Sequence, residues 1–286
     1  MHDDDHSEQL VESLREEEQE DRFPLALFVV PRRRLSDLVF DEPMTRRLTS
    51  IVHRWRHREF VYRGWGLGAV AASEGLCVLF EGPPGTGKTA AASAIARETG
   101  QALYEVNLGG ILSKYVGETE ANLCRVLDEG VSRKVALLFD EGDVLFSKRV
   151  ADPKDSGALG HNSVVGLILS RVARYPGLLF VTTNLGGALD AAMRQRFKVV
   201  VKFDLPEPRE RLLIWEQALA RVPVDFDGEV LLLAAERYKL SPREIISVVE
   251  QACFLAVEAG SEVTIDFLNR AILDVTDRSE HTFKPL

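Results

Sequence analysis

At positions 82–89 the chain reads Gly82-Pro83-Pro84-Gly85-Thr86-Gly87-Lys88-Thr89. This fits the pattern G-x-x-x-x-G-K-[ST], in which backbone N–H groups wrap around phosphate oxygens. The segment follows an apolar run at 76–80 and precedes a helical pattern that begins Thr89-Ala90-Ala91, which is the context the pattern requires. Lys88 would neutralise the β and γ phosphates, Thr89 would ligate magnesium, and the helix N-terminus would add positive potential. We therefore predict a nucleoside triphosphate site with the nucleotide-binding residues Gly82, Pro83, Pro84, Gly85, Thr86, Gly87, Lys88, Thr89 and Ala90.

Two carboxylates follow the apolar run at 135–139. Asp140 and Glu141 would lie at the carboxyl end of a strand, where an open α/β sheet forms its ligand crevice. Alone, such a pair is more typical of a turn. Together with the phosphate loop upstream, it predicts that Asp140 holds magnesium and that Glu141 orients and deprotonates the attacking water.

A third apolar run, at 178–182, ends in polar residues at the same predicted sheet edge. Asn184 could therefore hydrogen-bond the attacking water or the γ-phosphate. An Asn at a strand end is also a common turn former, so the residue is a catalytic candidate only in combination with the other motifs.

The order of these runs predicts an α/β fold with a mostly parallel sheet, because short β-branched runs alternate with helical segments. Beyond Pro206 and Pro208 only helical patterns follow, which indicates a small all-α lid. The predicted strands lie at 76–80, 102–106, 135–139, 178–182 and 199–203. The predicted parts are a disordered acidic tail (1–22), an N-terminal linker (23–34), the α/β nucleotide-binding part (35–206) and the helical lid (207–286).

Composition excludes several classes of protein. The 286 residues are 45% hydrophobic and 28% charged, as in globular proteins, and no apolar stretch is long enough for a bilayer span. A formal net charge of -9 makes nucleic acid an unlikely partner, since phosphate backbones attract basic surfaces. One alternative stays open, because the predicted helix at 44–62 carries arginines on one face that could touch nucleic acid. An acidic N-terminus, unlike a signal peptide, favours a cytoplasmic location.

With these motifs in order, the chain from Leu35 to Thr276 resembles the AAA+ ATPases, in particular the AAA subgroup of katanin, spastin and the proteasomal ATPases. That resemblance implies ATP and Mg²⁺ as cofactors and a P-loop NTPase core followed by the lid. The stretch 113–120 resembles the subgroup's pore loop, whose aromatic residue contacts a protein substrate in the channel of a hexamer. An aromatic ring offers a large, sequence-tolerant apolar contact. The residues implied here are Lys114, Tyr115 and Val116.

Arginines in two further segments match positions of the family. The stretch 189–197 resembles the one that carries trans-acting arginines, and it points to Arg196 first and Arg194 second. Relatives often have two adjacent arginines, whereas Gln195 stands at the first of those positions here. Arg243 resembles the lid arginine of other AAA+ groups and would either report on the γ-phosphate or face solvent.

The resemblance implies a chaperone-like homo-hexamer in which ATP hydrolysis threads or dismantles a protein substrate. An alternative is a nucleotide-switched assembly scaffold or regulator with little threading. Some similar bacterial single-ring ATPases accompany contractile injection machines, which would make such a machine the assembly partner.

Overall fold

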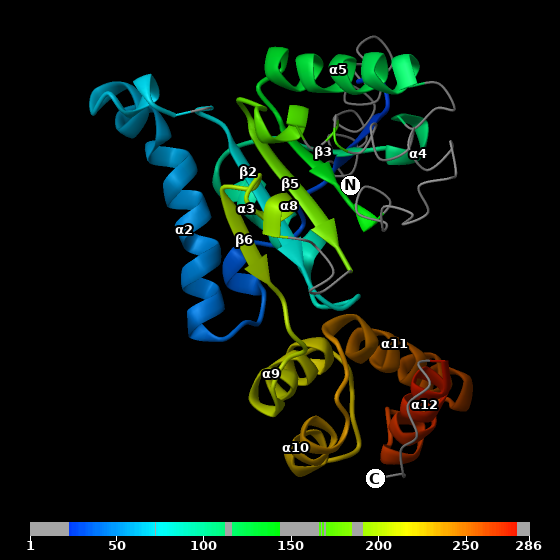
Figure 1. The fold of residues 1–286 in the computed structure, drawn as a ribbon. Coiled ribbons are helices and arrows are strands. Elements are labelled where there is room, and N and C mark those ends of the chain that lie inside the picture. Colours follow the sequence, from blue (N-terminus) through cyan, green and yellow to red (C-terminus); the bar gives the residue numbers. More distant parts are fainter. Residues whose placement is uncertain are drawn as a thin grey trace, which may run out of the picture.

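The computed structural model describes residues 23–71, 73–111, 116–143, 166, 168, 170–184 and 191–278. Its centre is a six-stranded sheet of order β1-β3-β4-β5-β2-β6 (Figure 1). All neighbouring strands are parallel except β1 and β3. The strands are β1 (Ala26–Val29), β2 (Leu76–Glu81), β3 (Leu103–Val106), β4 (Ala136–Phe139), β5 (Leu178–Thr183) and β6 (Val199–Lys202).

The five strands predicted from apolar runs are confirmed as β2 to β6. Every residue of β2, β4 and β5 is buried, as expected for central strands of a parallel sheet that is covered on both faces. Because these strands run parallel, their carboxyl ends lie at one edge of the sheet. The residues that follow β2, β4 and β5 are therefore brought together.

The first strand differs from the prediction of a linker at 23–34. Residues Ala26–Val29 pair antiparallel with β3, with Ala26 opposite Val106. The strand lies at the edge of the sheet, and Leu27 is 75% exposed. None of its four residues is fully buried, and the consecutive residues Leu27 and Phe28 are both exposed. The run therefore lacks the buried pattern of the central strands, and its pairing could not be seen in the sequence.

Helices cover both faces of the sheet. On one face, α2 (Glu42–Glu59) and α3 (Lys88–Glu98) form a core with β2 and β5 through residues such as Trp55 and Ile95. On the other face, α5 (Val116–Ser132) and the helical residues 168 and 170–173 pack through Leu123 and Val172. Two short helices, α4 (Leu108–Ile111) and α8 (Ala191–Arg194), precede α5 and β6.

Between residues 207 and 278 the lid has four helices with a core of their own, in which Trp215 and Tyr238 are fully buried. The helix that faces the sheet begins with a capping box formed by Ser241 and Glu244. In Figure 1 the lid lies beyond the carboxyl ends of β5 and β6. Its helices are α9 (Pro208–Leu219), α10 (Gly228–Arg237), α11 (Pro242–Ala259) and α12 (Ile265–Arg278).

The arginine-rich face of α2 is largely engaged within the protomer. Arg46 pairs with Glu42 at 3.0 Å, and Arg56 donates to the backbone oxygen of Glu98. Arg58 stacks over the ring of Trp55 at 3.6 Å. These contacts compete with phosphate for the guanidinium groups, which weakens the case for this helix as a nucleic-acid surface.

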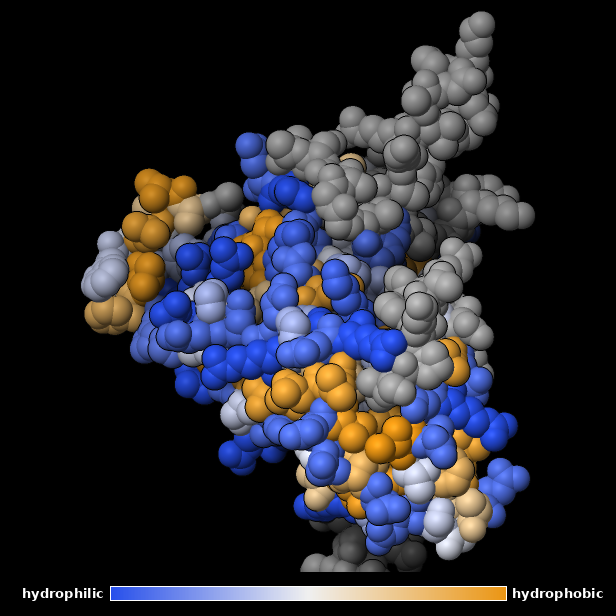
Figure 2. Space-filling view, turned by 90° about the horizontal axis from the view of Figure 1, so that it is seen from below, coloured by the Kyte–Doolittle hydropathy of each residue, from blue (hydrophilic) through white to orange (hydrophobic). Residues whose placement is uncertain are grey.

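Beyond α2, residues 60–70 form a projecting tip. Its apolar side chains are exposed, among them Trp65 (71% exposed) and Val70 (85% exposed). Figure 2 shows this tip as an apolar group at the left margin, separated by hydrophilic residues from the apolar surface of the lid. Lys198 holds the tip to the start of β6, because its Nζ donates to Tyr62 Oη and to Gly75 O. No helix in the described part of the chain has the length and apolar character that crossing a membrane requires.

Candidate nucleotide-binding and catalytic site

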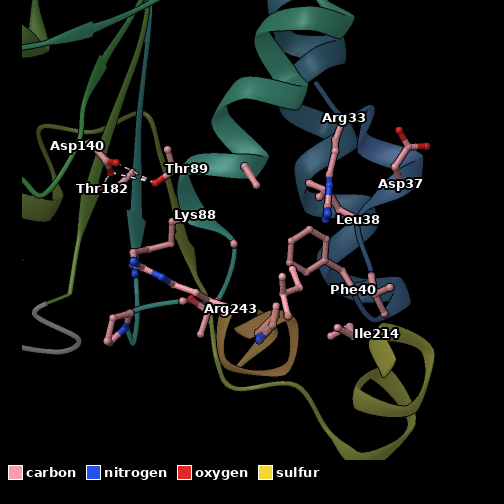
Figure 3. A pocket seen from close by; sticks show the side chains of 18 of the residues that line it. Arg33, Asp37, Leu38, Phe40, Lys88, Thr89, Asp140, Thr182, Ile214 and Arg243 are labelled. Atoms are coloured by element: carbon pink, nitrogen blue, oxygen red, sulfur yellow. Dashed lines mark hydrogen bonds between the residues drawn. The ribbon is translucent and has the colours of Figure 1, made fainter. Parts of the chain in front are cut away.

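A pocket of about 380 Å³ lies between the phosphate loop, the segment that precedes α2, and the lid (Figure 3). Among its lining residues are seven consecutive residues at 84–90, together with Asp140, Glu141, Asn184 and Arg243. The structure thus brings together at one pocket the residues predicted from four separate segments.

The Lys88 ammonium is held at the bottom of the phosphate loop. Its Nζ donates to the backbone oxygens of Gly82 and Pro83, each at 2.7 Å, and to Asn184 Oδ1 at 2.9 Å. The side chain comes from the first turn of α3, whose N-terminus follows Gly87 in a left-handed conformation (φ 96°). A buried cation beside a helix N-terminus favours the binding of a phosphate group.

The charges around this ammonium shift two pKa values. Burial lowers the pKa of Lys88, and the negative charges of Asp140 and Asp143 partly offset this effect. On the neighbouring strand β3, desolvation raises the pKa of Glu105, and the charges of Asp140 and Glu141 raise it further. Several carboxylates therefore surround the buried ammonium of Lys88. A cation bound together with the phosphates would reduce the repulsion among these carboxylates.

Gly85 joins the phosphate loop to the lid. Its φ is +77°, and a Cβ there would lie 2.6 Å from Ser241 Oγ, closer than van der Waals contact allows. Its backbone oxygen accepts a hydrogen bond from Arg243 N at 3.3 Å. Only glycine fits both the conformation and the space, so the N-terminus of α11 is set directly against the phosphate loop.

Oxygen ligands for a cation lie at the carboxyl end of β4. Thr89 Oγ1 is 3.1 and 3.0 Å from the two carboxylate oxygens of Asp140, and the Thr182 hydroxyl also donates to this carboxylate. Figure 3 shows the three side chains converging beside Lys88. In the described part of the chain no group of three or more His, Cys, Asp or Glu side chains could hold a metal ion. One carboxylate and one hydroxyl fit Mg²⁺, which takes most of its ligands from water and phosphates.

Glu141 stands in a strained turn directly after Asp140. Its φ of 49° is in the left-handed region, which non-glycine residues adopt at a cost of about 1–3 kcal/mol. Its backbone N–H donates to Thr182 Oγ1 at 3.1 Å, and the N–H of Gly142 donates to Thr182 O at 2.7 Å. Thr182 therefore fixes the turn that directs Glu141 to the pocket.

Two contributions to the site were missed in the sequence. One is polar: Thr182 and Asp143 hydrogen-bond the catalytic candidates and hold them in place. The only sign of this in the sequence was that Asp143 stands three residues after Asp140. The other is apolar: the far side of the pocket is lined by residues that could face a nucleotide base. These residues are Leu38, Val39, Phe40, Ile214 and Ile246.

The three candidate arginines lie in different surroundings. Arg243 lines the pocket of its own protomer. Arg194 forms an ion pair with Glu81 at 3.0 Å, within its own protomer. Arg196 is exposed, donates to the backbone oxygen of Gly166 at 3.2 Å, and lines a second pocket of about 370 Å³ together with Lys198.

The predicted pore loop is outside the described residues, apart from Val116, whose backbone begins α5. Nothing in the geometry therefore bears on Lys114 or Tyr115.

A phosphate loop between β2 and α3 of a mostly parallel sheet, facing an acidic pair at the end of β4, defines a P-loop nucleotide-binding protein. Residues 78–205 match the model of the family described as "ATPase family associated with various cellular activities (AAA)". The chain is 32% identical over 256 residues to the uncharacterized AAA family ATPase y4kL of Sinorhizobium fredii, covering 87% of this chain and 73% of that protein. It therefore belongs to the AAA family of ATPases.

Other similar proteins share the family but are much longer. ATPase family gene 2 protein homolog A of Homo sapiens is 38% identical over 164 residues, covering 55% of this chain and 18% of its own length. ATPase family gene 2 protein of Schizosaccharomyces pombe is 26% identical over 185 residues, covering 63% of this chain and 23% of its own. The chain thus spans about a fifth of these two relatives.

Solved structures agree with the fold. The FIGL-1 AAA domain has a TM-score of 0.67 at 20% identity, covering 92% of this chain and 87% of that one. The same domain in complex with ADP has a TM-score of 0.67 at 21% identity, covering 88% and 87%. The chain is thus an ATPase with the AAA fold.

Proposed function

We propose that this ATPase acts as a homo-hexameric ring that unfolds or dismantles a protein substrate by threading it through a central pore. Each ATP is bound by one protomer and completed by Arg196 of the next. The observation that carries the proposal is the position of Arg196, which is exposed and is not among the residues that line its own pocket. An arginine delivered by a neighbour stabilises the charge of the transferring phosphoryl group and accelerates hydrolysis by about 10³ to 10⁵.

The proposed roles at the pocket follow from the contacts. Lys88 binds the β and γ phosphates, while Thr89 and Asp140 would hold Mg²⁺, which would supply neutralisation of the phosphate charge. Glu141 orients and deprotonates the attacking water. Arg243 contacts the γ-phosphate from the lid, and its backbone bond to Gly85 would carry a change at the phosphates into α11.

For the substrate we propose Lys114, Tyr115 and Val116 as the pore loop, with Tyr115 gripping the polypeptide. The support is the resemblance of 113–120 to the pore loop of the family. We propose the cytoplasm as the location.

A mixing experiment tests the shared site. Lys88→Ala removes the phosphate lysine but leaves Arg196 intact, whereas Arg196→Ala leaves the pocket intact. Each variant alone should hydrolyse ATP poorly. Mixed together they should recover a measurable part of the activity, because pockets of Arg196→Ala protomers would be completed by Lys88→Ala neighbours. No recovery, in a mixture shown by mass measurement to co-assemble, would refute action in trans.

Electron microscopy of Glu141→Gln with ATP tests the ring itself. Retained nucleotide should hold the assembly together, and six protomers around a channel are expected. Threading is tested separately with Tyr115→Ala, which should keep ATPase activity and lose remodelling. A variant that keeps both would favour the assembly scaffold.

A further inference from the structure

We infer that Asn184 presents its carbonyl oxygen, and not its amide NH₂, to the nucleotide pocket, and that Asp143 is the positioning residue that fixes this orientation. The inference rests on the proposed catalytic role of the pocket residues and decides which reacting group Asn184 can touch.

The two ends of the Asn184 amide have opposite partners. Its Oδ1 accepts from Lys88 Nζ at 2.9 Å, and its Nδ2 donates to Asp143 Oδ2 at 3.3 Å. An ammonium group only donates hydrogen bonds, and an ionised carboxylate only accepts them. Turning the amide over would place donor against donor and acceptor against acceptor, so the network permits one orientation.

Asp143 is itself held in place by β5. Its Oδ1 accepts from the backbone N of Asn184 at 2.9 Å and from the hydroxyl of Thr183, a fully buried residue. These bonds occupy one carboxylate oxygen and aim the other at the Asn184 amide. Because both partners belong to the end of one central strand, the carboxylate and the amide form a rigid unit.

This orientation restricts the chemistry of Asn184. Phosphate oxygens are acceptors and cannot hydrogen-bond a carbonyl oxygen, whereas a water molecule can donate to it. Asn184 therefore serves as an acceptor for the attacking water and for the Lys88 ammonium, and does not donate to the γ-phosphate.

The substitution Asp143→Asn separates the two possibilities. The new amide can still accept from Thr183 and from the backbone, but its NH₂ then faces the NH₂ of Asn184. The bond that holds the Asn184 amide is thereby lost, and the orientation with its NH₂ toward the pocket becomes accessible. If the carbonyl is the working group, the single-turnover hydrolysis rate at saturating ATP falls by at least about tenfold, while ADP affinity stays within about twofold. If the NH₂ is the working group, turning it into the pocket keeps or raises the rate, and the inference is overturned.

A double-variant cycle shows whether Asp143 acts through Asn184. The variant Asp143→Asn/Asn184→Ala should hydrolyse no more slowly than Asn184→Ala alone, and losses that multiply would exclude a positioning role. The matched control is Asp225→Asn, an exposed carboxylate near the start of α10, which should hydrolyse at the wild-type rate.

A reciprocal swap tests the geometry without hydrolysis. Asp143→Asn and Asn184→Asp should each lower the thermal unfolding midpoint by about 3 °C or more, and the two together should regain most of the loss because donor again meets acceptor. If the unfolding midpoint of the double variant instead falls by the sum of the two single losses, the inference is overturned, even if the wild-type protein is fully active. Conversely, a wild-type protein without ATPase activity would fail the proposed function but leave this cycle interpretable.

Discussion

Nη2 of Arg194 lies 3.0 Å from Oε2 of Glu81, and this ion pair ties the segment ahead of β6 to the strand that leads into the phosphate loop. The Glu81 side chain is 5% exposed and that of Arg194 is 37% exposed. Arg196, two residues further on, is exposed. Two neighbouring arginines with the same sequence signal therefore have different surroundings, and this favours Arg196 as the residue that reaches a neighbouring protomer.

Arg194→Ala should lower the free energy of unfolding by about 1–3 kcal/mol, because the Glu81 carboxylate stays buried without its charged partner. Arg196→Ala should change it by no more than about 0.5 kcal/mol, as is usual for an exposed side chain, and should lose hydrolysis. Urea unfolding and ATPase assays on both variants check the pair. Equal destabilisation by the two substitutions would contradict the assignment.

Thr182→Val should reduce hydrolysis and stability together. The substitution keeps the shape of a side chain that is 2% exposed but removes the hydroxyl that donates to Asp140 and accepts from Glu141 N. Leaving the Glu141 N–H without its acceptor costs about 1–3 kcal/mol and frees the strained turn. Thermal unfolding and ATP turnover measure the two effects. A variant with normal turnover would show that Thr182 does not set the position of Glu141.

The sequence predicted the parts of this fold that follow from strong local rules. A glycine-rich loop between strand and helix requires a particular context, and fully apolar runs mark strands buried on both faces, as in β2 and β5. The edge strand β1 was not predicted because none of its four residues is fully buried, so it lacks the pattern of a core strand. The strand pairs with β3, which lies about eighty residues further along the chain. A pairing over that distance leaves no pattern in the local sequence.

The supporting residues of the site could not be predicted for a related reason. Asp143 and Thr182 have their roles because β4 and β5 are neighbours in a known register, with Phe139 opposite Val181. The apolar side of the pocket combines Phe40 with Ile214 from the lid. Such groupings depend on tertiary packing, whereas the phosphate loop is continuous in the sequence.

Gly85→Ala should weaken the coupling of the lid to the phosphate loop. A side chain at φ +77° costs about 1–2 kcal/mol, and its Cβ would meet Ser241 Oγ and displace α11. We expect weaker ADP binding and slower hydrolysis, measured by calorimetry and turnover. Gly228→Ala is the control, because a Cβ there meets no atom within 4 Å. If both variants bind ADP equally well, the contact between Gly85 and the lid has no role in binding.

Nucleotide affinity should depend on the protonation of Lys88. Burial lowers the pKa of this ammonium, and the negative charges of bound phosphates would raise it. At a pH between the lowered and the raised value, binding must take up a proton. ADP affinity should therefore fall as the pH rises through that range, and it should do so at a lower pH than for an ordinary lysine.

Titration calorimetry in two buffers with different ionisation enthalpies measures this proton uptake directly. Lys88→Arg provides the comparison, because a guanidinium stays protonated throughout the accessible range and can contribute no uptake. Uptake at alkaline pH in the wild type that disappears in Lys88→Arg would locate the proton on Lys88. If uptake persists in Lys88→Arg, the proton goes to another group, and the lysine is already fully charged before nucleotide binds.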